Sequence, residues 1–277
     1  LQKASLIMTD GTKIKLVAMD LDGTLLDSQK RVPEGFFDMA RDLHSRGIHV
    51  VIASGRQYYN ILTKFGDCQD DLVFMADNGA LFCIYGEIVL SRNFTSEQVE
   101  RVLRAASAIP TVLPVVCCAD CAYSPKCRHQ SEMDDIALYY ARVKHSDELF
   151  EKARRDKVIK IALHDLENST KNILPVLSPL DGDEMCVRVS ADIWLDVMPA
   201  GVDKGDGIRF LQQRLGISPD ECMAFGDFDN DLGLLSACTE SYAMANAVPQ
   251  VKAISKYEAP SNDDDGVMKV LRRVFCK

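Results

Sequence analysis

The sequence has no apolar run that approaches the ~20 residues a membrane-spanning helix needs. It also lacks the basic and then apolar opening segment that is typical of a secretory signal. Positive charge is in deficit, with 32 Lys and Arg against 41 Asp and Glu and a formal net charge of −9. This acidic balance argues against broad contact with nucleic acid or an anionic membrane surface. We therefore expect a cytoplasmic protein with no nucleic-acid and no membrane partner.

Several familiar site motifs are missing as well. The sequence has no Walker-type phosphate loop and no dinucleotide-binding glycine fingerprint. Its five histidines show no pairing that suggests a nucleophilic triad. No internal repeat or low-complexity tract is present. With 47% hydrophobic and 26% charged residues over 277 positions, the composition is that of a folded protein with one large domain or two ordinary ones.

Cysteine, in contrast, is plentiful. In a chain without a secretory signal, the ten cysteines are expected to be reduced thiols rather than a disulfide framework. The densest group lies at 117–127, where Cys118-x-x-Cys121 has the spacing of two zinc ligands. Because a second Cys-x-x-Cys pair is missing, we favour no bound metal, with a structural zinc as the alternative. Residues 1–12 are set aside as a leader or a cloning remnant, with Met8 the natural start in the second case.

The segment from 14 to 26 places two carboxylates where an apolar run ends. Residues 14–19 have the length of a buried strand, and Asp20 and Asp22 follow it, with Gly23-Thr24 directly after. In an open parallel sheet, ligands bind at the carboxyl ends of the strands. Oxygen ligands there suit Mg²⁺, whereas the alternative is an ordinary turn. These residues alone leave both interpretations open.

Strands and helices alternate in the first and last parts of the chain. Their order implies right-handed crossovers and a parallel sheet. Between 86 and 191 strands and helices mix without acids at the strand ends, which indicates an inserted domain of α+β type. The predicted fold class is therefore α/β, with a Rossmann-like parallel-sheet core at 13–85 and 192–277 that has helices on both faces, and an inserted α+β domain at 86–191.

A second possible site lies after the strand predicted at 48–53. This strand ends in Ser54-Gly55-Arg56, directly before a predicted helix at 57–65. A hydroxyl and a flexible glycine amide at such a turn can hold a phosphate at the start of the helix. A plain capped turn is the alternative from these residues alone.

Two further polar segments follow in the last part of the chain. Lys204-Gly205 opens a predicted helix, and Asp227-Phe228-Asp229-Asn230-Asp231 follows an apolar run at 222–225. A calcium loop would need Gly and Glu where Leu232 and Cys238 stand, so it is rejected. Because parallel strand ends share one edge of a sheet, the four polar segments are expected to meet. Acids there can hold a cation, and a hydroxyl and a lysine can neutralise a phosphoryl group.

Four segments, in this order, resemble the motifs of the haloacid dehalogenase-like superfamily: Asp20-Leu21-Asp22-Gly23-Thr24, Ser54-Gly55-Arg56, Lys204-Gly205 and Gly226-Asp227-x-x-Asn230-Asp231. The inserted domain resembles the type II (IIB) cap. The stretches 77–80 and 262–266 are similar to the Cof-type phosphatases of that superfamily. The resemblance covers nearly the whole chain and implies a Mg²⁺-dependent phosphatase for a small phosphorylated metabolite, such as a sugar phosphate.

The resemblance also implies a role for each matching residue. Asp20 would attack phosphorus to give an aspartyl-phosphate, and Asp22 would protonate the leaving oxygen and then take a proton from water. The Asp20 carboxylate, the Asp22 backbone carbonyl and Asp227 would hold Mg²⁺. Asp231 would belong to the metal site or hold Lys204, which would neutralise the developing charge.

Other matching residues would contact the substrate. Ser54 and the Gly55 amide would bind phosphoryl oxygens, and Asn230 would contact the phosphoryl group or the lysine. Arg56 and Asn78 are candidates for the substrate pocket, although either could equally serve a turn or a surface ion pair. The cap residues that set specificity are not identified by the sequence.

The implied chemistry leaves alternatives. An acid at Asp22 suits a phosphatase or a phosphomutase rather than a dehalogenase or an ion-pumping ATPase. A phosphomutase is the alternative enzyme, and a regulator that binds a phosphorylated ligand without turnover is the alternative outside enzymes. A closing cap favours compact metabolites over phosphoproteins. Trp194 is expected to pack at the cap junction, the acids at 263–265 to form a solvated loop, and the oligomeric state is left open.

Overall fold

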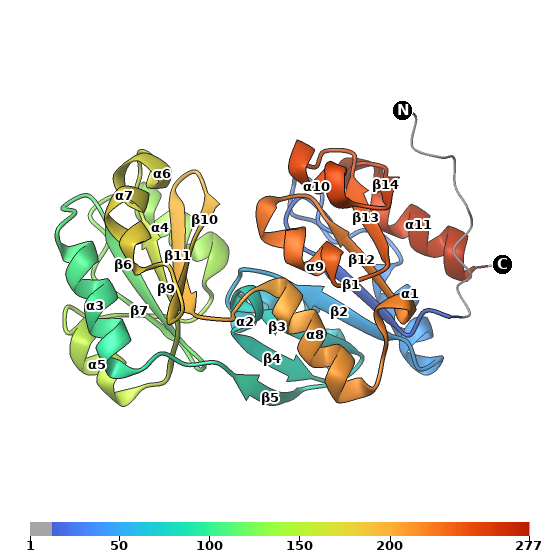
Figure 1. Cartoon of the computed structure of the whole chain (residues 1–277), viewed down its shortest axis with the longest axis horizontal. Coiled ribbons are helices and arrows are strands. Elements are labelled where there is room, and N and C mark those ends of the chain that lie inside the picture. Colours follow the sequence, from blue (N-terminus) through green and yellow to red (C-terminus); the bar gives the residue numbers. More distant parts are fainter. Residues whose placement is uncertain (1–12, 277) are drawn as a thin grey trace.

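The computed structural model describes residues 13–276, which form two bodies, each built around its own sheet (Figure 1). Two connecting segments run between the bodies, one after β5 (Glu87–Ser91) and one after β11 (Trp194–Pro199). The leader predicted at residues 1–12 lies outside the described residues. Within residues 13–276, no helix has the length and apolar character that a membrane crossing requires.

The core sheet has eight strands in the order β14-β13-β12-β1-β2-β3-β4-β5. β4 and β5 form an antiparallel hairpin at one edge, and the other six strands are parallel. β1 lies in the interior of the sheet and is buried along its whole length, as its unbroken apolar run predicts. The remaining bounds are β2 (His49–Ala53), β3 (Leu72–Ala76), β4 (Leu81–Ile84), β12 (Cys222–Gly226), β13 (Glu240–Met244), β14 (Tyr257–Ala259) and β1 (Leu16–Asp20).

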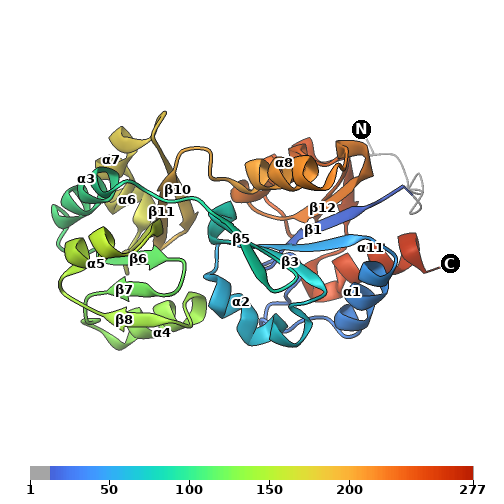
Figure 2. The same ribbon diagram turned by 90° about the horizontal axis from the view of Figure 1, so that it is seen from below.

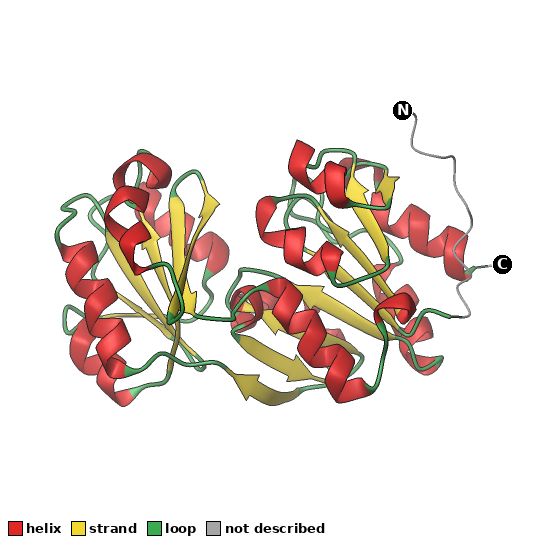
Figure 3. Cartoon of the chain, in the orientation of Figure 1, coloured by secondary structure: helices red, strands yellow, loops and turns green. Residues whose placement is uncertain are grey.

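Helices cover both faces of the core sheet (Figure 2). α8 (Lys204–Leu215) lies on one face, while α1 (Phe36–Ser45), α2 (Tyr58–Phe65) and α11 (Gly266–Phe275) lie on the other. α9 (Leu232–Ser236) packs against α8 and α10 (Pro249–Ile254). The arrangement of helices and strands (Figure 3) confirms the predicted α/β class and its parallel core.

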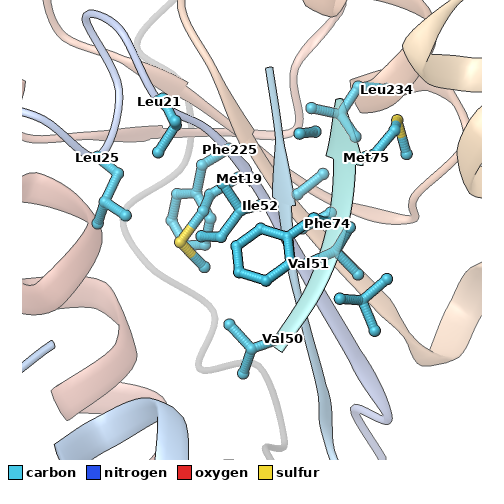
Figure 4. Close-up of a cluster of buried hydrophobic side chains, with 14 of the residues drawn as sticks. Met19, Leu21, Leu25, Val50, Val51, Ile52, Phe74, Met75, Phe225 and Leu234 are labelled. Atoms are coloured by element: carbon cyan, nitrogen blue, oxygen red, sulfur yellow. The ribbon is translucent and has the colours of Figure 1, made fainter. Parts of the chain in front are cut away.

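A row of large apolar side chains crosses the middle of the core sheet (Figure 4). Phe225, Met19, Ile52 and Phe74 occupy matched positions on four neighbouring strands and are fully buried. Burying an apolar side chain of this size stabilises the fold by roughly 1.5–3 kcal/mol. The row lies one or two residues before the carboxyl ends of these strands and therefore forms a rigid floor beneath the polar segments that follow.

The second body, the cap, is built on a six-stranded sheet in the order β10-β11-β9-β6-β7-β8. Only β7 and β8 pair in parallel, so the sheet is mixed. α3 packs against α5 and α7. The bounds are β6 (Leu113–Cys118), β7 (Ala122–Ser124), β8 (Val143–His145), β9 (Val158–His164), β10 (Met185–Ala191), α3 (Ser96–Ser107), α4 (Gln130–Tyr139), α5 (Leu149–Arg155), α6 (Ser169–Asn172) and α7 (Leu174–Leu177).

The predicted boundaries between core and cap, at residues 86 and 192, do not coincide with the positions at which the strands change from one sheet to the other. β5 pairs with β4 in the core sheet, and β11 pairs with β9 and β10 in the cap sheet. We therefore propose a cap that spans residues 92–199. The prediction placed the strand after 192 in the core because a strand next to a connecting loop can pair with either sheet, and the sequence does not show which.

Two local features of the described residues are the start of α1 and the state of the cysteines. α1 begins at Phe36, because Gly35 directly before it adopts a positive φ of 78° that ends the preceding turn. All ten cysteines are free thiols, and Cys118 and Cys121 are buried.

Candidate active site

The four polar segments meet at the edge of the core sheet that faces the cap. Asp20 is the last residue of β1, Ser54 follows β2, Lys204 is the first residue of α8, and Asp227 follows β12. A cavity of about 340 Å³ lies between this edge and the cap. Every predicted site residue except Lys204 and Asp231 lines it, and these two lie buried beneath Asp20 as described next.

A buried lysine joins two of the acids. Lys204 Nζ lies 2.5 Å from Asp20 Oδ1 and 2.6 Å from Asp231 Oδ1. Burial opposes the charge on Lys204, but the two carboxylates outweigh it and raise the pKa of this lysine. Burial raises the pKa of Asp20 well above its usual range, with Lys204 opposing the change. The pair therefore fixes the Asp20 carboxylate at the floor of the cavity.

Asp231 uses both of its carboxylate oxygens. Oδ1 accepts from Lys204, and Oδ2 accepts from the backbone N–H groups of Asp227 at 3.0 Å and Phe228 at 3.2 Å. Its side chain is fully buried. Asp231 thus holds both the lysine and the loop that carries Asp227, which favours the lysine-holding role among the two that the sequence left open.

Three carboxylates come close enough to share one cation. Ligand oxygens of Asp20, Asp227 and Asp231 lie within 4.8 Å of one another, and no other such group of His, Cys, Asp or Glu occurs in the described part of the chain. Burial and Asp231 raise the pKa of Asp227 to about 6, although a hydrogen bond from Thr24 opposes this. Hard carboxylate oxygens are the donors that Mg²⁺ prefers, so the group fits this ion.

Gly23 permits the close approach of Asp227 to the β1 loop. Its φ is +84°, and a Cβ at this position would overlap the Asp227 carboxylate. The neighbouring Thr24 Oγ1 donates to Asp227 Oδ1 at 2.8 Å. The Gly-Thr pair after the two acids is therefore explained by contacts with a loop about 200 residues away.

The Asp22 carboxylate forms ion pairs with two cationic side chains. Arg56 Nε and Nη2 lie 2.6 and 2.8 Å from its oxygens, and Lys30 Nζ lies at 2.7 Å. Burial alone would raise the pKa of Asp22, but the two cations outweigh it and lower that pKa to about 2. The sequence did not indicate the contact of Lys30 with Asp22. Lys30 lies in a loop, and its own backbone has a positive φ of 59°.

The remaining predicted residues form a hydrogen-bonded edge of the cavity. Ser54 Oγ accepts from the Arg56 N–H at 3.1 Å. Asn230 Nδ2 donates to Asn78 Oδ1 at 3.4 Å, and Asn78 Nδ2 donates to Asp196 Oδ2 of the cap at 3.1 Å. Asn78 has a φ of 57°, a conformation that asparagine tolerates better than most residues.

The cap supplies a wall that the sequence did not reveal. Lys160 and Asp196 lie on β9 and β11, and Tyr139, Tyr140 and Trp194 line the same cavity. Trp194 also packs against Tyr139 and Tyr140, so it serves both packing and the cavity wall. The sequence could have indicated Lys160 and Asp196, because each interrupts an apolar strand. A charged side chain that is buried in this way needs a polar partner.

Comparisons with known proteins agree over nearly the whole chain. A family model described as haloacid dehalogenase-like hydrolase matches residues 17–271. The chain is 32% identical to the 5-amino-6-(5-phospho-D-ribitylamino)uracil phosphatase YbjI of Escherichia coli over 95% of this chain and 96% of the relative. It is 28% identical to the HMP-PP phosphatase of Klebsiella pneumoniae over 86% of this chain and 87% of the relative.

Solved structures share the same fold. SMU.1108c from Streptococcus mutans UA159 is 25% identical with a TM-score of 0.86 and covers 95% of this chain and 100% of its own. TM0651 from Thermotoga maritima is 27% identical with a TM-score of 0.82 and covers 95% of this chain and 98% of its own. The chain belongs to the haloacid dehalogenase-like hydrolase family, among the Cof-type phosphatases with a IIB cap that hydrolyse phosphoric monoesters of small metabolites.

Proposed function

We propose that this phosphatase works through an aspartyl-phosphate on Asp20, with Mg²⁺ as its cofactor. The contact of Lys204 with Asp20 and Asp231, at 2.5 and 2.6 Å, carries the proposal. A carboxylate that is buried, paired with a fixed cation and open to a cavity is held in one orientation, as a nucleophile requires. Ligand binding alone would not need this arrangement, which argues against a non-catalytic regulator.

The proposed steps consume only the phosphate ester and one water molecule. An Asp20 oxygen attacks phosphorus, the bond from phosphorus to the ester oxygen breaks, and that oxygen takes a proton from Asp22. A water molecule then attacks the same phosphorus and gives a proton to Asp22, and inorganic phosphate leaves Asp20. Ser54 and the Gly55 amide bind phosphoryl oxygens, with Asn230 beside them. Lys204 offsets the negative charge that builds up.

The acid group of Asp20, Asp227 and Asp231 supports a bound Mg²⁺, with Asp20 and Asp227 as direct carboxylate ligands and the Asp22 carbonyl as a third. When bound, the ion supplies charge stabilisation for the phosphoryl group. Asp227 is prepared for this role by its own hydrogen bond from Thr24, which fixes one carboxylate oxygen.

Asp22 needs a change of partner before it can donate a proton. A carboxyl group with a pKa of about 2 is ionised at neutral pH. Its ion pair with Arg56 must therefore give way when substrate binds, so that the carboxyl group can take up a proton. Arg56 Nη1 also donates to the carbonyl of Leu138 in the cap at 2.7 Å, so the position of the cap affects the Asp22 pair.

For the substrate, we propose 5-amino-6-(5-phospho-D-ribitylamino)uracil as the first compound to test. Support comes from the relative of that name and from aromatic side chains, Tyr139 and Trp194, on which a planar ring can stack.

We also propose a reducing compartment such as the cytoplasm. The ten cysteines all lie within the described residues, and each is a free thiol. This pattern is usual where glutathione and thioredoxin keep thiols reduced.

The deciding experiment measures inorganic phosphate released from a panel of phosphorylated metabolites, with and without Mg²⁺, by the natural protein and by Asp20→Asn. We expect Mg²⁺-dependent release that Asp20→Asn lowers by at least about a thousandfold with an unchanged circular dichroism spectrum. Asp38→Asn is the matched control, because the Asp38 side chain is 90% exposed and does not line the cavity.

Other results would contradict the proposal. Turnover retained in Asp20→Asn would remove Asp20 from the nucleophilic role. Interconversion of phosphate isomers that depends on a bisphosphate, without phosphate release, would favour a phosphomutase. Tight binding of a phosphorylated ligand with neither reaction would favour a regulator.

A further inference from the structure

We propose that Lys160 of the cap is a positioning residue that orients the Ser54 hydroxyl through the Gly55–Arg56 peptide. The phosphate site of the core is then complete only while the cap is docked. This inference rests on the proposed function, because it assumes that Ser54 binds a phosphoryl oxygen.

Lys160 reaches out of the cap into the core. It lies on β9, is 1% exposed, and its Nζ donates to the Gly55 carbonyl oxygen at 2.7 Å. The same ammonium forms an ion pair with Asp77 of the core at 2.9 Å and lies 3.8 Å from Asp196 of the cap. One buried cation therefore contacts the core through a carboxylate and through the backbone of a phosphate-binding turn.

The Gly55 carbonyl belongs to the same peptide group as the Arg56 N–H. That N–H donates to Ser54 Oγ at 3.1 Å. A cation on the carbonyl polarises the peptide and strengthens its N–H as a donor. Because a hydroxyl has one donor and two acceptor positions, the bond from Arg56 occupies an acceptor position of Ser54 and leaves its hydrogen free for a phosphoryl oxygen.

The Gly55 carbonyl lies between two carbonyls that the backbone already holds. Gly55 has no side chain to restrict its own backbone, and the carbonyls of Ser54 and Arg56 on either side accept from the N–H groups of Asn78 and Asp77. The Lys160 ammonium fixes the Gly55 carbonyl between them. Burial opposes the charge on Lys160, but Asp196 and Asp77 outweigh it and raise the pKa of this lysine, so it stays cationic.

The cap also contacts the core through hydrogen bonds that do not involve Lys160. Gln57 Oε1 accepts from the backbone N–H groups of Ala141 and Arg142, and Gln57 Nε2 donates to the Arg142 carbonyl. These bonds join core and cap without touching Gly55 or Ser54. Gln57→Leu is therefore a control that removes these three hydrogen bonds between core and cap, while the Lys160 contacts still hold the cap on the core.

The test measures the affinity of inorganic phosphate, with Mg²⁺ present, by isothermal titration calorimetry. Lys160→Met alone leaves Asp77 buried without its cation and can misfold, so Lys160→Met/Asp77→Asn is prepared beside it. We expect about a tenfold weaker phosphate affinity in both, the scale of one lost hydrogen bond to a charged group. Gln57→Leu is expected to bind phosphate within about twofold of the natural protein.

A thermodynamic cycle shows whether Lys160 acts through Ser54. In a Ser54→Ala background, Lys160→Met/Asp77→Asn is expected to cause no further loss of phosphate affinity, because the two changes break one chain of contacts. An equal tenfold loss in both backgrounds would overturn the inference, as would unchanged affinity in the natural background. If the natural protein binds no phosphate at all, the proposed function fails and the inference with it. Normal binding with an unaffected Lys160 variant rejects the inference alone.

Discussion

At the scale of single residues, Lys204 determines the charge balance of the site. Its ammonium lies between Asp20 and Asp231, and Asp227 is close by. A lone buried carboxylate is strongly disfavoured, and removing one partner of a buried ion pair costs about 3–5 kcal/mol. The lysine therefore stabilises the fold of the loops as well as serving the chemistry.

Lys204→Met is expected to lower the free energy of unfolding by about 3–5 kcal/mol at pH 8 and by less at pH 5. The reason is that burial already raises the pKa of Asp20 and Asp227 above their usual values, and loss of the cation raises them further. Groups with a raised pKa bind more protons in the folded state, so stability falls as the pH rises through that pKa.

Urea unfolding at both pH values, with EDTA present, measures this difference. Lys15→Met is the control, because Lys15 pairs with Glu221 at the surface with 56% of its side chain exposed, and such pairs contribute about 0–1 kcal/mol. An equal loss of stability at pH 5 and pH 8 for Lys204→Met would show that buried charge is not the cause.

At the scale of elements, the start of α8 depends on contact with α9. Gly205 follows Lys204, and a Cβ at Gly205 would lie 2.6 Å from the backbone carbon of Gly233. The two glycines let the helices approach, and Asp203 Oδ1 caps α8 by accepting from the Asp206 N–H at 2.7 Å. This packing fixes the position from which Lys204 reaches Asp20.

Gly205→Ala is expected to destabilise the protein by about 1–3 kcal/mol, as overpacking does, and to lower kcat because Lys204 shifts with the helix. Urea unfolding and steady-state kinetics measure the two effects. Gly66→Ala is the matched control, since Gly66 has a right-handed helical φ of −58° and nothing lies within 4 Å of an added Cβ. A neutral Gly205→Ala would mean that α8 and α9 can separate without consequence.

Most elements were predicted from local pattern alone. β2 and β12 lie on the apolar runs noted at 48–53 and 222–225, because an apolar run between turn residues marks a buried strand clearly. The short elements β7, β8, α10 and β14 were not predicted. β7 and β8 have three residues each and are held by pairing with β6 and with each other, and three residues are too few to show a periodicity.

At the scale of the whole molecule, metal binding and global stability are linked. Three carboxylates, one at the end of β1 and two in the segment after β12, lie within 4.8 Å of one another, so a shared cation would relieve repulsion between segments far apart in sequence. A ligand that binds only the folded state stabilises it by mass action, by about 2.7 kcal/mol at 100 times its dissociation constant.

Saturating Mg²⁺ is therefore expected to raise the melting temperature by several degrees over a sodium control of equal ionic strength. Asp227→Asn is expected to lose this response, because it removes one carboxylate charge from the shared group. Asp263→Asn is the control, since Asp263 belongs to the exposed acidic loop and accepts hydrogen bonds from Ser28 at the surface. Differential scanning calorimetry measures both, and an undiminished response in Asp227→Asn would place the ion elsewhere.

The sequence by itself determined the family, the parallel core and the set of residues at its edge. It could do so because buried parallel strands appear as apolar runs, and the residue after each run lands at the same edge of the sheet whatever surrounds it. Only the tertiary structure decided the pairing of Asp22 with Arg56 and Lys30, the reach of Lys160 into the Gly55 turn, and the membership of β11 in the cap sheet. These depend on how the cap docks on the core and on which strands pair, and contacts between residues as far apart as Gly55 and Lys160 leave no local pattern.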